Sequence, residues 1–180
     1  MSFFLRKISR AKWDPNLQLD SASFTADAIT GCNRTNENKL SVWLSETKDL
    51  NNEQVEKLIV ALATTMEKPA PLDILWLDPV WLSDNGFEVE ENEGKTRYVS
   101  VNHLHRDIAR LNHSGLAAVG THIVSQINSE NHHRVIKSDL IKLVYKWMKA
   151  DGDFRVEDLD DKWHPELYKY EKRLEQQQNN

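Results

Sequence analysis

Apolar residues between positions 52 and 66 recur every three or four residues, which is the period of a helix with one buried face. Asn51 precedes this segment, and Gln54 stands three residues after Asn51. This spacing is that of a capping box. Pro69 and Pro71 end the pattern, because proline does not continue a helix. The sequence therefore predicts an amphipathic helix over 52–66, with an apolar stripe of Val55, Leu58, Ile59, Leu62 and Met66.

Four shorter segments have the alternation or the apolar content of strands. Residues 40–45 combine leucine, valine and tryptophan, and residues 72–77 form the kind of apolar run found in strands buried on both faces. Residues 87–92 alternate apolar and acidic side chains. After a Glu-Gly turn, residues 95–101 return as the second strand of a hairpin. These segments predict a small sheet.

Helical periodicity dominates the chain after Asn102. Within 104–111, apolar side chains recur on one helical face, and Asn102 is placed to cap that helix. Ser114 and Ser138 mark the starts of two further helices, and a last helix is expected from about residue 156. The C-terminal part of the chain is therefore expected to be helical.

Together these elements predict an α+β fold, in which a small sheet and one amphipathic helix precede a helical C-terminal region. A change in composition near residues 129–133 separates an α+β domain, 1–128, from the helical region, 129–180. We expect the helical region to pack on the first domain rather than to fold independently. Residues 1–13 carry four basic residues and no acidic one, and their pattern fits either a strand or a helix.

Charge and cysteine content narrow the classes of function. The chain of 180 residues has a net charge of −5, which argues against general nucleic-acid binding because that binding depends on clustered Lys and Arg. Cys32 is the single cysteine, so an intrachain disulfide and a cysteine zinc cage are both excluded. No apolar run reaches the roughly 18 residues of a membrane span. A soluble cytoplasmic protein is therefore expected.

The segment around residue 105 carries the most suggestive chemistry. In an extended chain, His103, His105 and Asp107 project to one side, where they could bind a divalent metal such as zinc. The sequence His-Leu-His-Arg-Asp over 103–107 resembles the signature of the metallo-β-lactamase-like hydrolases. In that family a further histidine follows the aspartate, where this chain has Ile108. The resemblance implies a metal-dependent hydrolase or nuclease. Further ligands could come from other histidines, namely His113, His122, His132 and His133.

Two other interpretations use the same residues. The order from His105 to Asn112 is that of a kinase catalytic loop, in which Asp107 would orient a hydroxyl and Asn112 would bind a metal ion. No glycine-rich phosphate loop precedes it. If the segment is instead helical, His103, Asp107 and Arg110 share a solvated face and act only as surface pairs. This structural interpretation is the one that we favour from the sequence.

The turn after residue 148 resembles a degenerate EF-hand calcium loop. Asp151, Asp153 and Asp160 fall at ligand positions, but Lys149 occupies the first one and Phe154 replaces the glycine of the sharp turn. A cation in the first ligand position opposes calcium binding. The turn is therefore interpreted as a connection between two helices.

The sequence contains no complete catalytic set, but its C-terminal part is rich in aromatic residues. Trp147, Trp163 and Tyr168 are the expected partner-binding residues, with Tyr145 and Tyr170 nearby, because Trp and Tyr are enriched at protein interfaces. The sequence thus predicts a non-enzymatic adaptor or regulatory protein that recognises another protein and needs no cofactor. The alternative is the metal-dependent hydrolase or nuclease.

Overall fold

The structure is a computed structural model, and it describes residues 2–33 and 35–178. Its contacts divide the chain into two units that alternate along the sequence. The sheet unit comprises Met1–Lys48, Asp73–Glu93 and His103–Arg134. The helical unit comprises Asp49–Leu72, Gly94–Asn102 and Val135–Asn180. The expected division after residue 128 stays a prediction.

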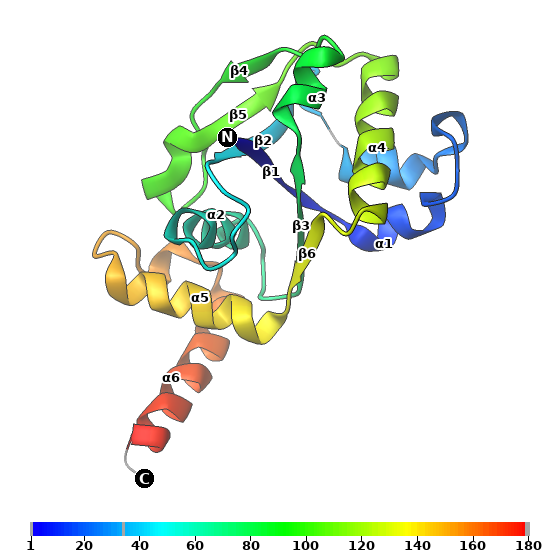
Figure 1. Cartoon of the computed structure of the whole chain (residues 1–180). Coiled ribbons are helices and arrows are strands. Elements are labelled where there is room, and N and C mark those ends of the chain that lie inside the picture. The colour runs from blue at the N-terminus through cyan, green and yellow to red at the C-terminus, as the bar shows by residue number, and fades with distance from the viewer. Residues whose placement is uncertain (1, 34, 179–180) are drawn as a thin grey trace. The chain divides into compact units, whose positions relative to one another are not determined.

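Six strands form one sheet in the order β4-β5-β2-β1-β3-β6 (Figure 1). The central strand β1 pairs antiparallel with β2 and β3, and β2 and β4 pair antiparallel with β5. The strands are β1 (Phe3–Ile8), β2 (Leu40–Ser45), β3 (Leu72–Leu77), β4 (Val89–Glu91), β5 (His105–Ile108) and β6 (His132–Val135). The α+β class expected from the sequence is therefore confirmed.

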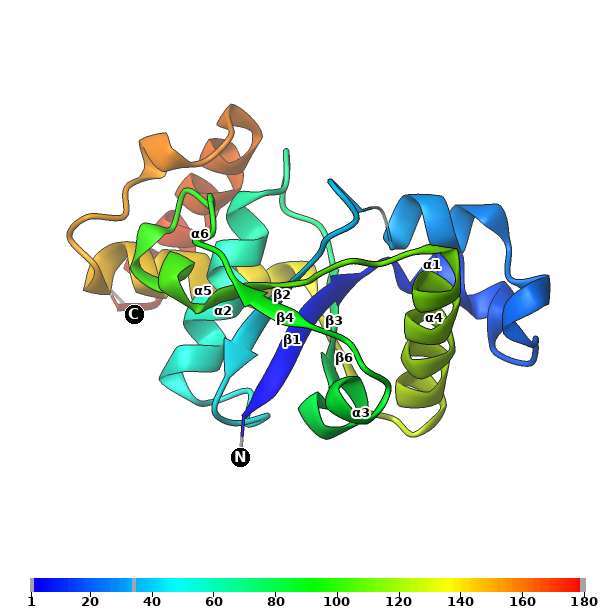
Figure 2. The same ribbon diagram turned by 90° about the horizontal axis from the view of Figure 1, so that it is seen from above.

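The core of the sheet unit lies between one face of the sheet and the helix α4 (His113–Asn128). Alternate strand residues project to this face, which is the side-chain period of a β-strand. The helix α1 (Arg10–Trp13) lies beside α4 (Figure 1 and Figure 2) and contributes the fully buried Trp13. Gly120 permits this close packing, since a Cβ there would lie 3.0 Å from the Phe24 ring.

The helical unit contains three main helices, which are α2 (Glu53–Thr64), α5 (Lys137–Ala150) and α6 (His164–Gln178). Asn52 caps α2 by accepting a hydrogen bond from the Gln54 amide. The sequence placed this helix correctly and missed its cap by one residue. Its apolar stripe is buried, as the periodicity predicted, because Val55, Leu58, Ile59 and Leu62 all lie in the core.

The sheet unit also contains a short helix after β3. The helix α3 (Pro79–Asp84) follows β3 and is capped by Asp78, which accepts from the Val80 amide. No helix among the described residues is long and apolar enough to cross a bilayer.

Two expectations for the middle of the chain are wrong. Residues 95–101 are not a strand, and Asn102 does not cap a helix. Instead the buried Asn102 closes a loop, because its Oδ1 accepts from Thr96 Oγ1 at 2.7 Å and its Nδ2 donates to the Thr96 carbonyl at 3.1 Å. Asn102 itself lies within a 3-10 helix, Val99–Leu104. The hairpin partner of β4 is therefore β5, with Val89 opposite Ile108.

Candidate functional site

The structure brings together two of the three residues expected to bind a metal. His105 and Asp107 are alternate residues of β5, and His105 Nε2 lies 3.8 Å from Asp107 Oδ1. His103 belongs to the preceding 3-10 helix and is exposed. The favoured helical interpretation of this segment is thus wrong for residues 105–108, because pairing with β2 and β4 holds them extended.

The surroundings of His105 and Asp107 form a closed hydrogen-bond network. Asn92 Nδ2 donates to Asp107 Oδ2 at 2.6 Å, and Ser41 Oγ donates to Oδ1 at 3.3 Å. The Nδ1 atom of His105 lies 2.9 Å from the Asn92 carbonyl, and its ring packs edge-on against Trp43. In the described part of the chain, no group of three or more His, Cys, Asp or Glu side chains is arranged to hold a metal ion. The network stabilises the sheet, and metal binding by His103, His105 and Asp107 stays a prediction.

The remaining histidines that could supply ligands have other surroundings. His122 is buried, stacks on Trp81 with 3.9 Å between ring centroids, and accepts a hydrogen bond from the Asp78 amide at 3.3 Å. Burial lowers the pKa of His122 to about 4, opposed by the nearby Asp78 carboxylate. His122 is therefore a neutral ring of the core at pH 7.

The kinase-like and EF-hand-like patterns both serve local structure. Asn112 caps α4 by accepting from the Gly115 amide at 2.8 Å. Asp151 closes its own turn by accepting from the Asp153 amide at 3.1 Å, and the buried Phe154 packs against Tyr98. The turn connects α5 to the segment before α6, as the helix-connection interpretation expected.

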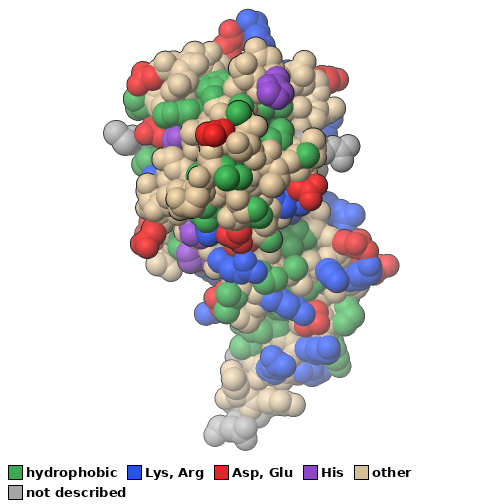
Figure 3. Space-filling model, turned by 90° about the vertical axis from the view of Figure 1, so that its right-hand side faces the viewer, with side chains coloured by type: hydrophobic (Ala, Val, Ile, Leu, Met, Phe, Trp, Pro, Cys, Tyr) green, Lys and Arg blue, Asp and Glu red, His purple; other side chains and the backbone are tan. Residues whose placement is uncertain are grey.

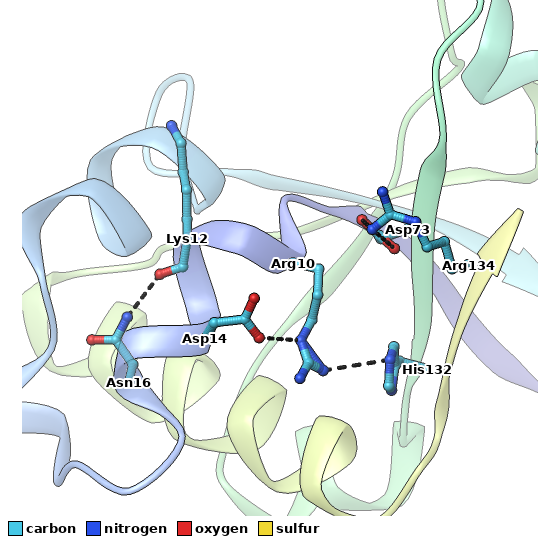
Figure 4. Close-up of polar contacts among 7 residues, drawn as sticks. All are labelled: Arg10, Lys12, Asp14, Asn16, Asp73, His132 and Arg134. Carbon is cyan, nitrogen blue, oxygen red and sulfur yellow. Dashed lines mark hydrogen bonds and ion pairs between the residues drawn. The ribbon is translucent and has the colours of Figure 1, made fainter. Parts of the chain in front are cut away.

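A second polar cluster, at the ends of β1, β3 and β6, was missed by the sequence analysis (Figure 4). Asp73 is buried and accepts from Arg134 Nη1 at 3.2 and 3.3 Å. Arg10 donates to Asp14 at 2.8 Å, and its Nη1 lies 3.4 Å from His132 Nε2. Each carboxylate faces an arginine, so the cluster contains two ion pairs, of which Arg10–Asp14 is local at i, i+4 spacing. No local spacing signals the second pair, because Asp73 and Arg134 are 61 residues apart.

The three expected partner-binding residues differ in their exposure. Trp163 is fully buried and donates to the Met66 carbonyl at 2.9 Å. Trp147 is 7% exposed, and its indole donates to Glu56 Oε2 at 3.2 Å. Tyr168 is 60% exposed. The two tryptophans thus hold the helical unit together, and Tyr168 alone of the three presents a large ring to solvent.

Tyr168 stands at the rim of a cavity of about 460 Å³ in the helical unit, which we call the tyrosine groove. Apolar side chains from α5, α6 and the connection between them line it, together with Lys149, Arg155, His164 and Glu171. Glu171 orders the rim, since it accepts from the Tyr145 hydroxyl at 2.9 Å and from Lys149 at 3.0 Å. We define the tyrosine groove by Tyr145, Met148, Phe154, Val156, Leu167 and Tyr168.

A second cavity, of about 790 Å³, lies between α5 and α6 and is lined by basic residues; we call it the basic groove. Figure 3 shows Lys and Arg side chains interspersed with hydrophobic ones over these C-terminal helices. The sequence analysis flagged Tyr170 in this region but missed the basic groove, because its charges come from two separate helices. We define the basic groove by Lys137, Ser138, Ile141, Lys142, Glu166, Lys169, Tyr170, Arg173, Leu174 and Gln177.

Comparison with protein-family models, with curated proteins and with solved structures found no match for this chain.

Proposed function

We propose that this protein is a non-enzymatic adaptor or regulator that recognises another protein through the tyrosine groove of its C-terminal helices. The observation that carries the proposal is the 60% exposed Tyr168 at the rim of a groove with apolar walls. Tyrosine is enriched among the residues that dominate binding energy at protein interfaces. An exposed ring beside an apolar groove is the arrangement expected for a contact with an apolar side chain of a partner.

The rim of the groove supports this role because its side chains contact one another. Tyr145 packs edge-on against Tyr170, with 5.3 Å between ring centroids, and its hydroxyl is held by Glu171. The ammonium of Lys172 lies 5.6 Å from the centre of the Tyr168 ring. A groove of fixed shape loses less conformational entropy on binding, which favours affinity.

The polar residues that the sequence suggested for catalysis do not support an enzymatic role as the tyrosine groove supports recognition. Asp107 and Asn112 have hydrogen-bond partners that stabilise the sheet and the start of α4. Recognition of a partner by the tyrosine groove leaves these hydrogen bonds of Asp107 and Asn112 intact. The helical unit is therefore the part of the molecule in which we place the function.

The proposal is tested by replacing Tyr168 with a photo-reactive amino acid and identifying the protein that it cross-links in the source cells. The affinity of the purified partner is then measured for the wild type and for Tyr168→Ala. We expect truncation of a hot-spot tyrosine to weaken binding by about 30-fold, or about 2 kcal/mol. Val80→Ala, which truncates an exposed side chain of the sheet unit, is the control and should leave affinity unchanged. Equal affinities for the wild type and Tyr168→Ala would contradict the proposal.

A further inference from the structure

We propose that the basic groove binds an acidic, amphipathic helical segment of a protein. This inference rests on the proposed function in one respect, because both assume that the chain binds another protein. It concerns a different groove from that of Tyr168, so the two can be tested separately. Three features of the basic groove carry it, namely its charge, its apolar floor and its length.

The charge of the groove is positive and largely uncompensated. Four cations line it, and Glu166 is its single carboxylate. Glu166 Oε1 is shared by Lys137 at 3.1 Å and Lys169 at 4.0 Å. Lys142 and Arg173 make no salt bridge within 4 Å to a carboxylate of residues 2–33 or 35–178. The groove can therefore accept further carboxylates.

The floor of the groove is apolar, which a purely electrostatic site does not need. Ile141 is almost buried on α5, and Tyr170 and Leu174 are half-buried on α6. Burying this apolar surface under a ligand would be favourable because it removes apolar area from water. A ligand that fits both features has apolar side chains toward the floor and acidic side chains toward the rim.

The lining residues of α6 recur at helical spacing along one face. They span 11 residues of rise, so the groove follows the helix axis for about 16 Å, or about three turns. An amphipathic helix of similar length presents its apolar stripe at matching intervals, which is the helix-in-groove mode of recognition. The α6 residues of the groove are Glu166, Lys169, Tyr170, Arg173, Leu174 and Gln177.

Nucleic acids and anionic membranes are the competing ligands, and the structure favours neither. Nucleic-acid affinity comes mainly from phosphate contacts, which would leave the apolar floor unused. Membrane binding by helices requires an apolar face that protrudes into the lipid boundary, whereas these apolar residues line a cavity.

The experiment uses the full-length protein and a synthetic, fluorescein-labelled helical peptide of about 16 residues, which is about 24 Å long as a helix and so extends past both ends of the groove. Leucine lies on one face of the peptide and glutamate flanks it. A second peptide, with lysine in place of every glutamate, is the charge-reversed probe. Labelled single-stranded oligonucleotide and phosphatidylserine vesicles test the competing ligands. Affinities are measured by fluorescence anisotropy, or by co-sedimentation for the vesicles.

The variant Lys142→Glu/Arg173→Glu reverses the two unpaired charges of the groove, and Lys68→Glu/Lys95→Glu is the matched control. Lys68 and Lys95 are exposed residues of the same helical unit and lie outside the groove. We expect the acidic peptide to bind the wild type and to lose at least 30-fold in affinity with the groove variant. The control variant should change affinity less than 3-fold, and the charge-reversed peptide should not bind.

Amide-exchange protection of 137–142 and 166–174 in the wild type by the acidic peptide is a second readout, independent of the folding of any variant. Binding of the peptide that is equal for groove and control variants would overturn the inference. Binding of only oligonucleotide or only vesicles would overturn it as well. Tyr168→Ala should leave peptide binding unchanged, so a failure of this inference is distinguishable from a failure of the proposed function.

Discussion

At the scale of single residues, the polar side chains that look chemical in the sequence mostly form local structural hydrogen bonds. Asn102 closes a loop, Asn112 caps α4, and Asp107 accepts hydrogen bonds from Asn92 and Ser41. Catalytic sites and structural networks draw on the same donors and acceptors, so residue type alone does not distinguish them. The surrounding partners do, and those of Asp107 lie 15 and 66 residues away in the sequence.

His122 provides a test at this scale, because its pKa of about 4 lies below its usual 6.5. Between pH 4 and pH 6.5, His122 is protonated in the unfolded chain and neutral in the folded chain. Stability contributed by neutral His122 is therefore present above pH 6.5 and is lost as the pH falls toward 4. We expect this group to account for a loss of about 3 kcal/mol in the free energy of unfolding by pH 4.

Urea unfolding of the wild type and of His122→Phe at pH 7.5, 5.5 and 4 checks this prediction. Phenylalanine keeps a ring against Trp81 but cannot titrate, so the variant should be less stable at pH 7.5 and less sensitive to acid. His103→Ala, at an exposed position, is the control and should follow the wild type. The same pH dependence in His122→Phe and the wild type would rule out His122 as the source.

At the scale of elements, segments with a strong local period could be predicted from the sequence, and segments fixed by distant partners could not. The strands over 40–45 and 72–77 and the helix α2 are confirmed, because their apolar patterns suffice to define them. The strand β5 was missed, since its extended form depends on pairing with β2 and β4.

The strand β1 illustrates a second reason for failure. Phe4 and Ile8 face the core, and Arg6 lies between them on the same face. Its guanidinium is buried and donates to the Ser41 and Cys32 carbonyls at 2.6 and 2.7 Å. A charged residue at an inward position breaks the expected alternation, so the sequence left strand and helix open for residues 1–13.

The loop closed by Asn102 gives a test at the scale of elements. Asn102→Ala removes three hydrogen bonds to Thr96 and leaves buried polar groups of Thr96 unpaired. We expect a loss of about 3 kcal/mol in the free energy of unfolding, since each buried unpaired group costs about 1–3 kcal/mol. Asn85→Ala, which removes one exposed hydrogen bond to the Trp81 carbonyl, is the control and should cost less than about 1 kcal/mol. Equal costs for the two variants, measured by urea unfolding, would contradict the assigned role of Asn102.

At the scale of the whole molecule, the net charge does not show how positive and negative side chains are distributed over the surface. A net charge of −5 correctly describes an acidic chain, yet the basic groove gathers four cations around one carboxylate. The sequence could flag the aromatic C-terminal region but not which of its rings are exposed. Trp147 and Trp163 fill the interior of the helical unit, whereas Tyr168 lies at the surface. Exposure follows from the packing of helices, which no single segment encodes.

The central claim is that the C-terminal helices recognise another protein, and hydrogen–deuterium exchange with the cross-linked partner tests it most directly. Amide exchange of the full-length chain is measured with and without the purified partner. We predict that protection is concentrated in 137–178, around the tyrosine and basic grooves. Protection centred on residues 103–107, with none over α5 and α6, would contradict the claim.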